Sequence, residues 1–306
     1  MQILNFSYFG EISALCAAIC WSIAVIIFKS ASTQLSPFLI TSLKNTIALI
    51  LFIIFFILFD IPIYYNNLTN SDYSKIIISG VLGMGFGDIL FIHALSKIGA
   101  NRIAIMNCFE PAVIYFFSII MLGTILTTHQ LIGFMIVIIS LLIIAYENDY
   151  IDIDPEVKKK GILLQIIAIL MSSFGIVLIK PVLNKAGDSI YFQLWITAFR
   201  LFPGFIIAWS VFLLQNNKKN LLLPLKNSKI LWKIIVSSGL GTFIALSFWI
   251  IGYAKIDKPP IASIIGQTSV IFIAIMSYII LKEKISRIRF FSMGVAIIGV
   301  LLITMK

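Results

Sequence analysis

The sequence has 306 residues, of which 60% are hydrophobic and 12% are charged, and its mean hydropathy is +1.06. Water-soluble domains are about 45–50% apolar and about 25% charged, so this composition excludes an ordinary soluble protein and predicts that the lipid bilayer is the solvent. The formal net charge is +10, but most of the basic residues lie between apolar segments, where they face water and lipid head groups. We therefore expect no nucleic-acid partner.

Charged residues, prolines, glycines and asparagines divide the chain into ten apolar segments. A helix that crosses the hydrocarbon needs roughly 20 apolar residues. In chain order the segments are 12–30, 37–59, 76–96, 103–122, 131–146, 161–183, 190–214, 234–254, 259–281 and 290–305. Their apolar runs are unbroken, whereas the strands of a transmembrane barrel alternate apolar and polar residues. The sequence predicts an all-α membrane protein of ten transmembrane helices, with no room for an appended soluble domain.

The chain contains an internal repeat. The hydrophilic stretch near its middle predicts a charged linker, 148–160, between two five-helix halves, 1–147 and 161–306. Matching residues lie 151–158 positions apart; the pairs are Gly10 and Gly161, Ser22 and Ser173, Lys29 and Lys180, Lys44 and Arg200, and Gly83 and Gly241. Because each half has an odd number of helices, the two halves enter the bilayer in opposite directions. Inverted repeats of this kind are typical of transporters that present one midplane site alternately to each side.

Several loose motifs occur in the same order in both halves. They are Trp21-Ser22 before Lys29, then Lys44, Phe91 with Ala94-Leu95, Glu110-Pro111, and Gln130 with Gly133, followed in the second half by Ser173 with Lys180, Arg200, Gly252-Tyr253-Ala254 and Leu281-Lys282-Glu283. With these motifs the chain resembles the ten-helix, EamA-type branch of the drug/metabolite transporter superfamily over essentially its whole length. The resemblance implies secondary transport, commonly export, of small organic solutes such as amino acids through a cavity between the halves.

Ionisable residues inside a span are costly to bury and usually face a bundle interior or a water-filled cavity, so each one is a candidate functional residue. Glu110 follows Asn107 by one turn on the same helix face, and Pro111 after it frees a backbone carbonyl. This carboxylate could bind a substrate amine or carry a coupled proton; the alternative is a structural carboxylate bonded to a neighbouring helix. Gln267 in the ninth segment is roughly the repeat counterpart of Glu110.

Asp88 ends a glycine-rich stretch, Gly85-Phe86-Gly87-Asp88, which matches the G-x-G-D signature of intramembrane aspartyl proteases. Such a protease needs a second aspartate in a neighbouring helix, because two carboxylates share the catalytic proton. The other aspartates lie at helix ends or in loops, so the sequence favours a transporter over an enzyme. His93 lies about 140° around the helix from Asp88. His93 is either a proton carrier or a structural, hydrogen-bonded residue.

The remaining basic and aromatic candidates differ in how deep they lie within their predicted membrane spans. Lys29 and Lys180 close their helices near an interface, where the long side chain carries the charge to water. Arg200 lies deeper and could bind a substrate carboxylate, pair with an acidic residue, or play a structural role. Trp21 and Trp249 lie inside their spans and could line a cavity, although interfacial belts explain most membrane aromatics.

These observations predict a secondary transporter, an exporter of an amino acid or similar metabolite, in the plasma (inner) membrane, as a monomer or a homodimer. The predicted substrate-binding residues are Glu110, Asp88, Asn107, Trp21, Arg200, Trp249 and Gln267, and the candidates for proton coupling are Glu110, His93 and Asp88. We expect no cofactor and no metal site, since the three cysteines have no metal-ligand spacing. The alternatives are the protease and an exporter of hydrophobic cationic drugs, which rests on Glu110 among aromatic residues.

Two arguments about orientation disagree. If the chain crosses the membrane ten times, both termini lie on the same side of it. Of the basic residues that we assigned to one side or the other, five lie on the side of the termini and fourteen on the opposite side. The positive-inside rule therefore places both termini outside the cell. The resemblance implies that both termini lie in the cytoplasm.

Overall fold

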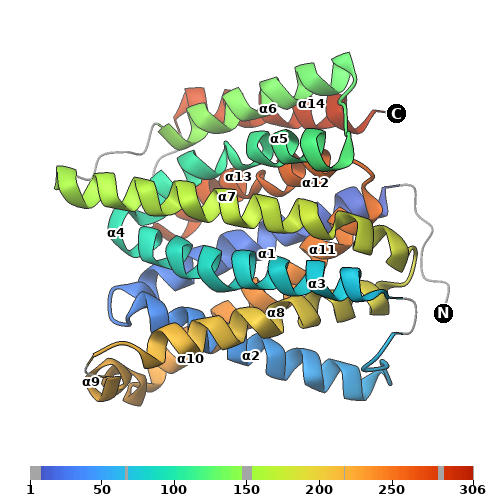
Figure 1. The fold of residues 1–306 in the computed structure, drawn as a ribbon. Helices are drawn as coiled ribbons and strands as arrows, with labels where there is room; N and C mark the ends of the chain where they lie inside the picture. The colour runs from blue at the N-terminus through green and yellow to red at the C-terminus, as the bar shows by residue number, and fades with distance from the viewer. Residues whose placement is uncertain (1–7, 66–67, 147–153, 217, 282–285, 306) are drawn as a thin grey trace.

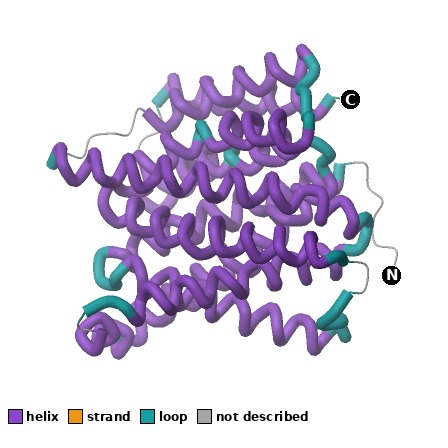
Figure 2. The backbone as a smooth tube through the Cα atoms, viewed as in Figure 1, coloured by secondary structure: helices purple, strands orange, loops and turns teal. Residues whose placement is uncertain are grey.

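The computed structural model describes residues 8–65, 68–146, 154–216, 218–281 and 286–305, and the regular structure of these residues is entirely helical. The elements are α1 (Phe9–Ser32), α2 (Pro37–Leu58), α3 (Asn70–Ser79), η1 (Gly80–Gly87), α4 (Asp88–Asn107), α5 (Glu110–Leu122), α6 (Thr128–Tyr146), α7 (Pro155–Ala186), α8 (Ile190–Leu213), α9 (Lys218–Leu222), η2 (Leu223–Lys226), α10 (Ser228–Ser237), η3 (Ser238–Ala245), α11 (Leu246–Lys255), α12 (Pro259–Gly266), α13 (Ser269–Leu281) and α14 (Arg287–Thr304). The helices lie side by side, and most connecting loops gather at the two ends of the bundle (Figure 2).

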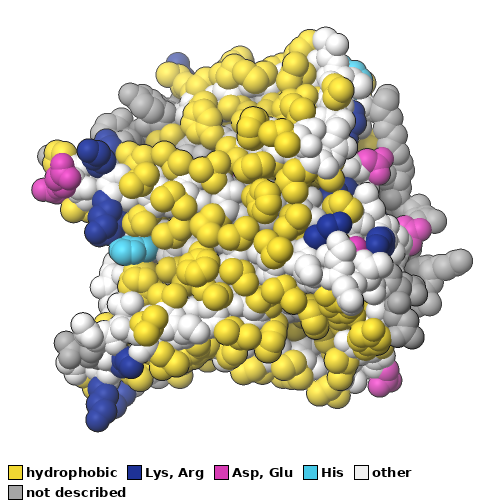
Figure 3. Space-filling view, viewed as in Figure 1, with side chains coloured by type: hydrophobic (Ala, Val, Ile, Leu, Met, Phe, Trp, Pro, Cys, Tyr) yellow, Lys and Arg dark blue, Asp and Glu magenta, His cyan; other side chains and the backbone are white. Residues whose placement is uncertain are grey.

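The prediction of an all-α membrane protein is confirmed. Within the described residues, eight helices are long and apolar enough to cross a membrane, and shorter apolar helices cover Thr128–Ile144 and Phe290–Thr304. Hydrophobic side chains cover the middle of the face in Figure 3, and charged side chains lie towards its two ends. The ten predicted segments correspond in order to these helices, whereas the crossing of the membrane by all ten stays a prediction.

Helix α7 overlaps the predicted linker. Helix α7 begins at Pro155, because the side chain of Asp154 accepts hydrogen bonds from the backbone N–H groups of Glu156 and Val157 and so caps the helix. Residues 155–160 of the predicted linker are therefore helical, while residues 147–153 lie outside the described part of the chain.

The corresponding helices of the two halves run in opposite directions. In Figure 1, α3 and α4 run from right to left, whereas their repeat counterparts α10 and α11 run from left to right. The largest cluster of buried apolar side chains joins helices of both halves, among them α1, α5, α7, α11 and α12. The two halves therefore pack against each other through this cluster.

Each half contains a π-helical segment at the same repeat position. Segments η1 (Gly80–Gly87) and η3 (Ser238–Ala245) lie 158 positions apart, and such segments often occur at functional sites. Glycines in η1 let helix α8 approach closely. A Cβ atom at Gly80 would lie 2.1 Å from the backbone oxygen of Arg200, and one at Gly83 would lie 2.8 Å from Nη2 of the same arginine.

One predicted span in each half is interrupted near its middle. Helix α4 ends at Asn107 and α5 begins at Glu110, while α12 ends at Gly266 and α13 begins at Ser269. At the offset of 158 that relates η1 to η3, Glu110 aligns with Thr268, and Gln267 lies one position earlier, in the break itself. Broken helices of this kind build the midplane substrate sites of many transporters with inverted repeats.

The two breaks have different local causes. In the first half, Pro111 occupies the first turn of α5, where the missing N–H group costs nothing. The second half has no proline here. Instead the hydroxyl of Thr268 donates a hydrogen bond of 2.6 Å to the carbonyl of Ile265, and such side-chain bonds compete with the backbone ladder of a helix.

Lys180 does not carry its charge to water as we predicted, and the half-buried Lys29 also binds backbone carbonyl groups. The Nζ of Lys180 donates hydrogen bonds to the carbonyls of Tyr253 (2.7 Å) and Ile256 (2.8 Å) at the end of α11, and Lys180 is 2% exposed. The Nζ of Lys29 donates to the carbonyls of Leu95 and Ser96 in α4. Both lysines therefore bind the carbonyl groups that close the third predicted span of their own half, a favourable place for a cation.

Replacing Lys180 by Met is expected to lower the free energy of unfolding by roughly 1.5–3 kcal/mol, the range for hydrogen bonds to a charged group. Thermal or denaturant unfolding of the purified protein in detergent measures this effect. Lys29→Met is the matched control, and we expect a smaller loss because Lys29 is only half-buried and water can replace its amine. Equal losses of stability in both variants would contradict a specific role for Lys180 as the buried partner of these carbonyl groups.

Candidate functional site

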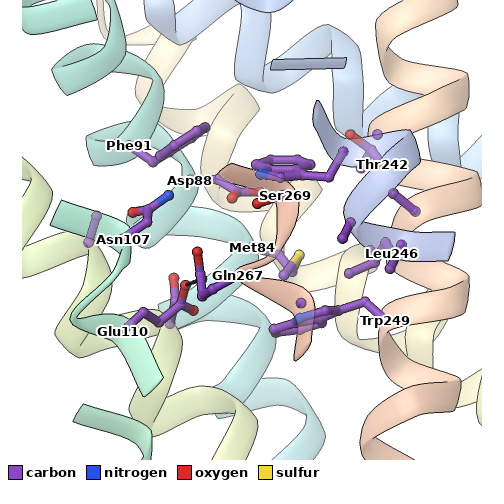
Figure 4. Close-up of a pocket in the computed structure, with 18 of the residues that line it drawn as sticks. Met84, Asp88, Phe91, Asn107, Glu110, Thr242, Leu246, Trp249, Gln267 and Ser269 are labelled. Atoms are coloured by element: carbon purple, nitrogen blue, oxygen red, sulfur yellow. Dashed lines mark hydrogen bonds between the residues drawn. The ribbon is translucent and has the colours of Figure 1, made fainter. Parts of the chain in front are cut away.

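A cavity with about 1000 Å³ of empty volume, its open mouth included, lies between the two halves. The segments that line it include η1, η3 and the two helix breaks. All the residues predicted to bind substrate line this cavity; they are Trp21, Asp88, Asn107, Glu110, Arg200, Trp249 and Gln267. Figure 4 shows Asp88, Asn107, Glu110 and Gln267 around one space; Asp88 and Asn107 are the two ends of α4, Glu110 begins α5, and Gln267 follows α12. Binding of a substrate by these residues stays a prediction.

Glu110 and Gln267 connect the two helix breaks. The amide Nε2 of Gln267 donates a hydrogen bond of 2.6 Å to Oε2 of Glu110, and Figure 4 marks this bond with a dashed line. Within the described residues Glu110 forms no ion pair. A carboxylate in a membrane interior without a cationic partner is costly, so the cavity offers an acidic group that a ligand cation or a proton can neutralise.

Asp88 forms an ion pair with Lys44, which the sequence analysis did not place at the binding site. The lysine side chain is 4% exposed and that of Asp88 16%, and Lys44 also donates to the side-chain oxygen of Asn45 at 3.2 Å. The amide of Asn45 in turn donates to the carbonyl of Met84 in η1. Asp88 therefore faces a lysine rather than a second carboxylate, and this geometry gives no support to an aspartyl protease.

Arg200 lies at the cavity wall and pairs with neither Asp88 nor Glu110 among the ion pairs of the described residues. It is 1% exposed. Its Nε donates a hydrogen bond of 2.8 Å to the hydroxyl of Ser79. Its Nη1 and Nη2 have no hydrogen-bond partner among the described residues. The Trp249 ring lies with its centroid 5.8 Å from the guanidinium carbon, at a distance typical of a cation–π contact.

Two further uncharged polar residues, Gln165 and Thr242, line the site; the sequence analysis named Asn107 and Gln267 but missed these two, because it started from the ionisable groups. Gln165 of α7 is 2% exposed and donates a hydrogen bond of 2.7 Å to Oδ1 of Asn107. Thr242 of η3 is also buried at the cavity. Gln165 interrupts an otherwise apolar run in the sequence, a signal that could have identified it.

His93 is the one predicted functional residue that lies outside the cavity lining. Its ring contacts Phe38 edge to face, with centroids 5.6 Å apart. Coupling of transport to a proton through His93 stays a prediction; the hydrogen bond of the Glu110 side chain is to Gln267, not to His93.

The cavity is balanced in formal charge. Lys44 and Arg200 supply two cations, and Asp88 and Glu110 supply two carboxylates. Around these groups lie the aromatic rings of Trp21 and Phe91, whose centroids are 5.7 Å apart. The described residues contain no cluster of three His, Cys, Asp or Glu side chains that could hold a metal ion. The arrangement suits a small organic molecule that carries charges of both signs.

Comparison with known proteins gives one family. A model of the EamA-like transporter family matches the chain twice, over residues 8–146 and 159–305. A solved structure described as "Crystal structure of protein" is similar with a TM-score of 0.70 and 14% sequence identity, and the match covers 96% of each chain. At this identity the likeness concerns the fold alone. No curated protein matches the sequence.

Proposed function

Because this chain belongs to the EamA-like transporter family, we propose that it is a secondary transporter that moves a small organic solute by alternating access, with the cavity between its halves as the substrate site. Transporters of this kind bind substrate near the membrane midplane, at the interface of the two repeats. The proposal includes ten membrane crossings and a location in the plasma membrane.

The hydrogen bond between Glu110 and Gln267 is the observation that carries this proposal. It joins a break in a helix of the first half to the corresponding break in the second half, at the wall of the cavity. A substrate that binds here touches both halves at once. A rocking motion of one half against the other would then open the same site first to one side and then to the other.

An amino acid or a similar zwitterion is the substrate that we propose. Glu110 is free of ion pairs among the described residues, so it would bind the substrate ammonium group or exchange it for a proton. The family resemblance favours export. Arg200 disfavours the alternative of a hydrophobic cationic drug, because it is a cation at the cavity without an ion-pair partner among the described residues and would repel the drug.

Reconstitution into liposomes tests the proposal. Liposomes that contain the protein and a mixture of the standard amino acids are expected to release some of them faster than protein-free liposomes, and mass spectrometry of the external solution identifies which. Protein inactivated by heat before reconstitution is the control. Transport of hydrophobic cations without any amino-acid release would favour the drug exporter, and cleavage of membrane peptides without any solute release would favour the protease.

A further inference from the structure

The two halves differ at one pair of positions in the cavity. Asp88 follows η1 directly, and Leu246 follows η3 directly at the equivalent place 158 positions later. Both side chains line the cavity, and both are labelled in Figure 4. The basic residues, by contrast, are present in both halves, since Lys44 and Arg200 are repeat counterparts. The first half therefore has a cation with its carboxylate, and the second half has the cation alone.

The helices that carry these residues pack in corresponding pairs in the two halves. Helix α2, which carries Lys44, packs against α4, whose first residue is Asp88, and helix α8, which carries Arg200, packs against α11, whose first residue is Leu246. Lys44 is neutralised by Asp88. Because a leucine stands in the corresponding place of the second half, Arg200 lacks the carboxylate partner that its position predicts.

The free groups of Arg200 have the form of an anion site. The Nε of Arg200 donates to the hydroxyl of Ser79, which in turn donates a hydrogen bond of 2.6 Å to the carbonyl of Gly175. These contacts occupy only the Nε side of the guanidinium. Nη1 and Nη2 are buried and have no hydrogen-bond partner among the described residues. An unpaired buried charge costs several kcal/mol, and a guanidinium presents donors that match a carboxylate with two parallel hydrogen bonds.

We propose that Arg200 binds the carboxylate of the transported solute. In the second half this carboxylate takes the place that the carboxylate of Asp88 occupies in the first half. This inference rests on the proposed transport function and adds a requirement to it: the substrate must carry a carboxylate. Glu110 is then left for the ammonium group. Amines that lack a carboxylate bind weakly, because they leave Arg200 unpaired.

The sharpest test supplies the missing carboxylate from the protein itself. Leu246→Asp places an acidic group where Asp88 stands in the other half, so it neutralises Arg200 and excludes the substrate anion. Leu246→Asn is the matched variant, which makes the same change of size and polarity without the charge. We expect amino-acid affinity in L246D to be roughly tenfold or more below that in L246N, which corresponds to the loss of a charge-assisted bond.

Thermal shifts of the purified proteins measure binding, because a bound ligand stabilises the folded state. The probes are the standard amino acids and the amines that their decarboxylation produces. The proposal predicts that wild-type protein is stabilised by an amino acid and far less by its amine. A shift of the same size with the matched amine, or equal affinity of L246D and L246N for the amino acid, would overturn it.

The proposed function can stand when this inference fails. If liposomes release amines as readily as amino acids, the protein is a transporter and Arg200 is not a carboxylate site. If the wild-type protein neither binds nor releases any member of either panel, the proposal of an amino-acid substrate fails, and the assignment of Arg200 fails with it. Arg200→Lys provides a second measurement, since a lysine keeps the charge and loses the paired donors; we expect weaker amino-acid binding, and unchanged binding would contradict the proposal.

Discussion

A Glu110→Gln variant is expected to lose most of its transport while it keeps its fold. Glutamine has nearly the same shape, and its side-chain oxygen can still accept the hydrogen bond from Gln267, which is 2.6 Å long in the wild-type protein. What the variant loses is the negative charge that would bind a substrate ammonium group or a proton. A contact with a charged group is worth roughly 1.5–3 kcal/mol, so we expect the initial rate of amino-acid release to fall by about 10- to 100-fold.

Glu156→Gln is the matched control for this experiment. Glu156 is an exposed residue in the first turn of α7, and the same chemical change there should leave the rate of release close to that of the wild type. Both variants should unfold at temperatures close to that of the wild type in detergent. Transport by E110Q at the wild-type rate would mean that Glu110 is a structural carboxylate that joins the two helix breaks.

The second large effect concerns the ion pair between Lys44 and Asp88. Replacing Asp88 by Ala leaves a buried ammonium group, with a side chain that is 4% exposed, beside the single neutral acceptor of Asn45. Removing one partner of a buried pair typically costs about 3–5 kcal/mol. We expect the free energy of unfolding to fall by this amount, as measured by denaturant titration in detergent.

A double variant separates the effect of losing the ion pair from the effect of leaving one buried charge without a partner. Lys44→Met with Asp88→Leu replaces both charges by apolar groups of similar size, and such replacements are often close to neutral. The double variant should therefore be more stable than D88A. If the two proteins are equally unstable, the ion pair contributes more than mutual neutralisation, and our account of it is wrong.

An exposed ion pair provides the comparison. Lys255, at the end of α11, binds Asp188 in the loop between α7 and α8, and hydrogen bonding to this lysine lowers the pKa of Asp188. The side chain of Asp188 is 83% exposed, and pairs in water contribute little. Asp188→Asn should therefore change stability far less than D88A does.

Much of the architecture can be predicted from the sequence alone. Unbroken apolar segments indicate membrane helices because backbone groups in lipid must satisfy their hydrogen bonds within the segment. Lys180 matches Lys29, and Arg200 matches Lys44, at equivalent places in the second half of the sequence. These matches indicate two related halves. Every predicted substrate-binding residue lies at the cavity, because polar residues inside spans avoid lipid and face the interior.

Local features of the sequence predicted some details and missed others. Pro111 indicates a disturbance in the fourth predicted span, and the structure has a helix break there. The equivalent break at Gln267 and Thr268 contains no proline, so it gave no comparable signal. Asp154 was expected in a linker, yet it caps the first turn of α7.

The partners of the buried polar groups were decided by the tertiary structure. Lys44 and Asp88 are 44 positions apart, and Glu110 and Gln267 are 157 apart. Hydropathy along the chain reflects the exchange of each residue between water and lipid, so it determines which segments enter the membrane and which residues are costly there. It carries no information on which helix faces touch. Only the packing of both halves around one cavity gives Asp88 a lysine, leaves Arg200 without a carboxylate, and turns a list of costly residues into a site.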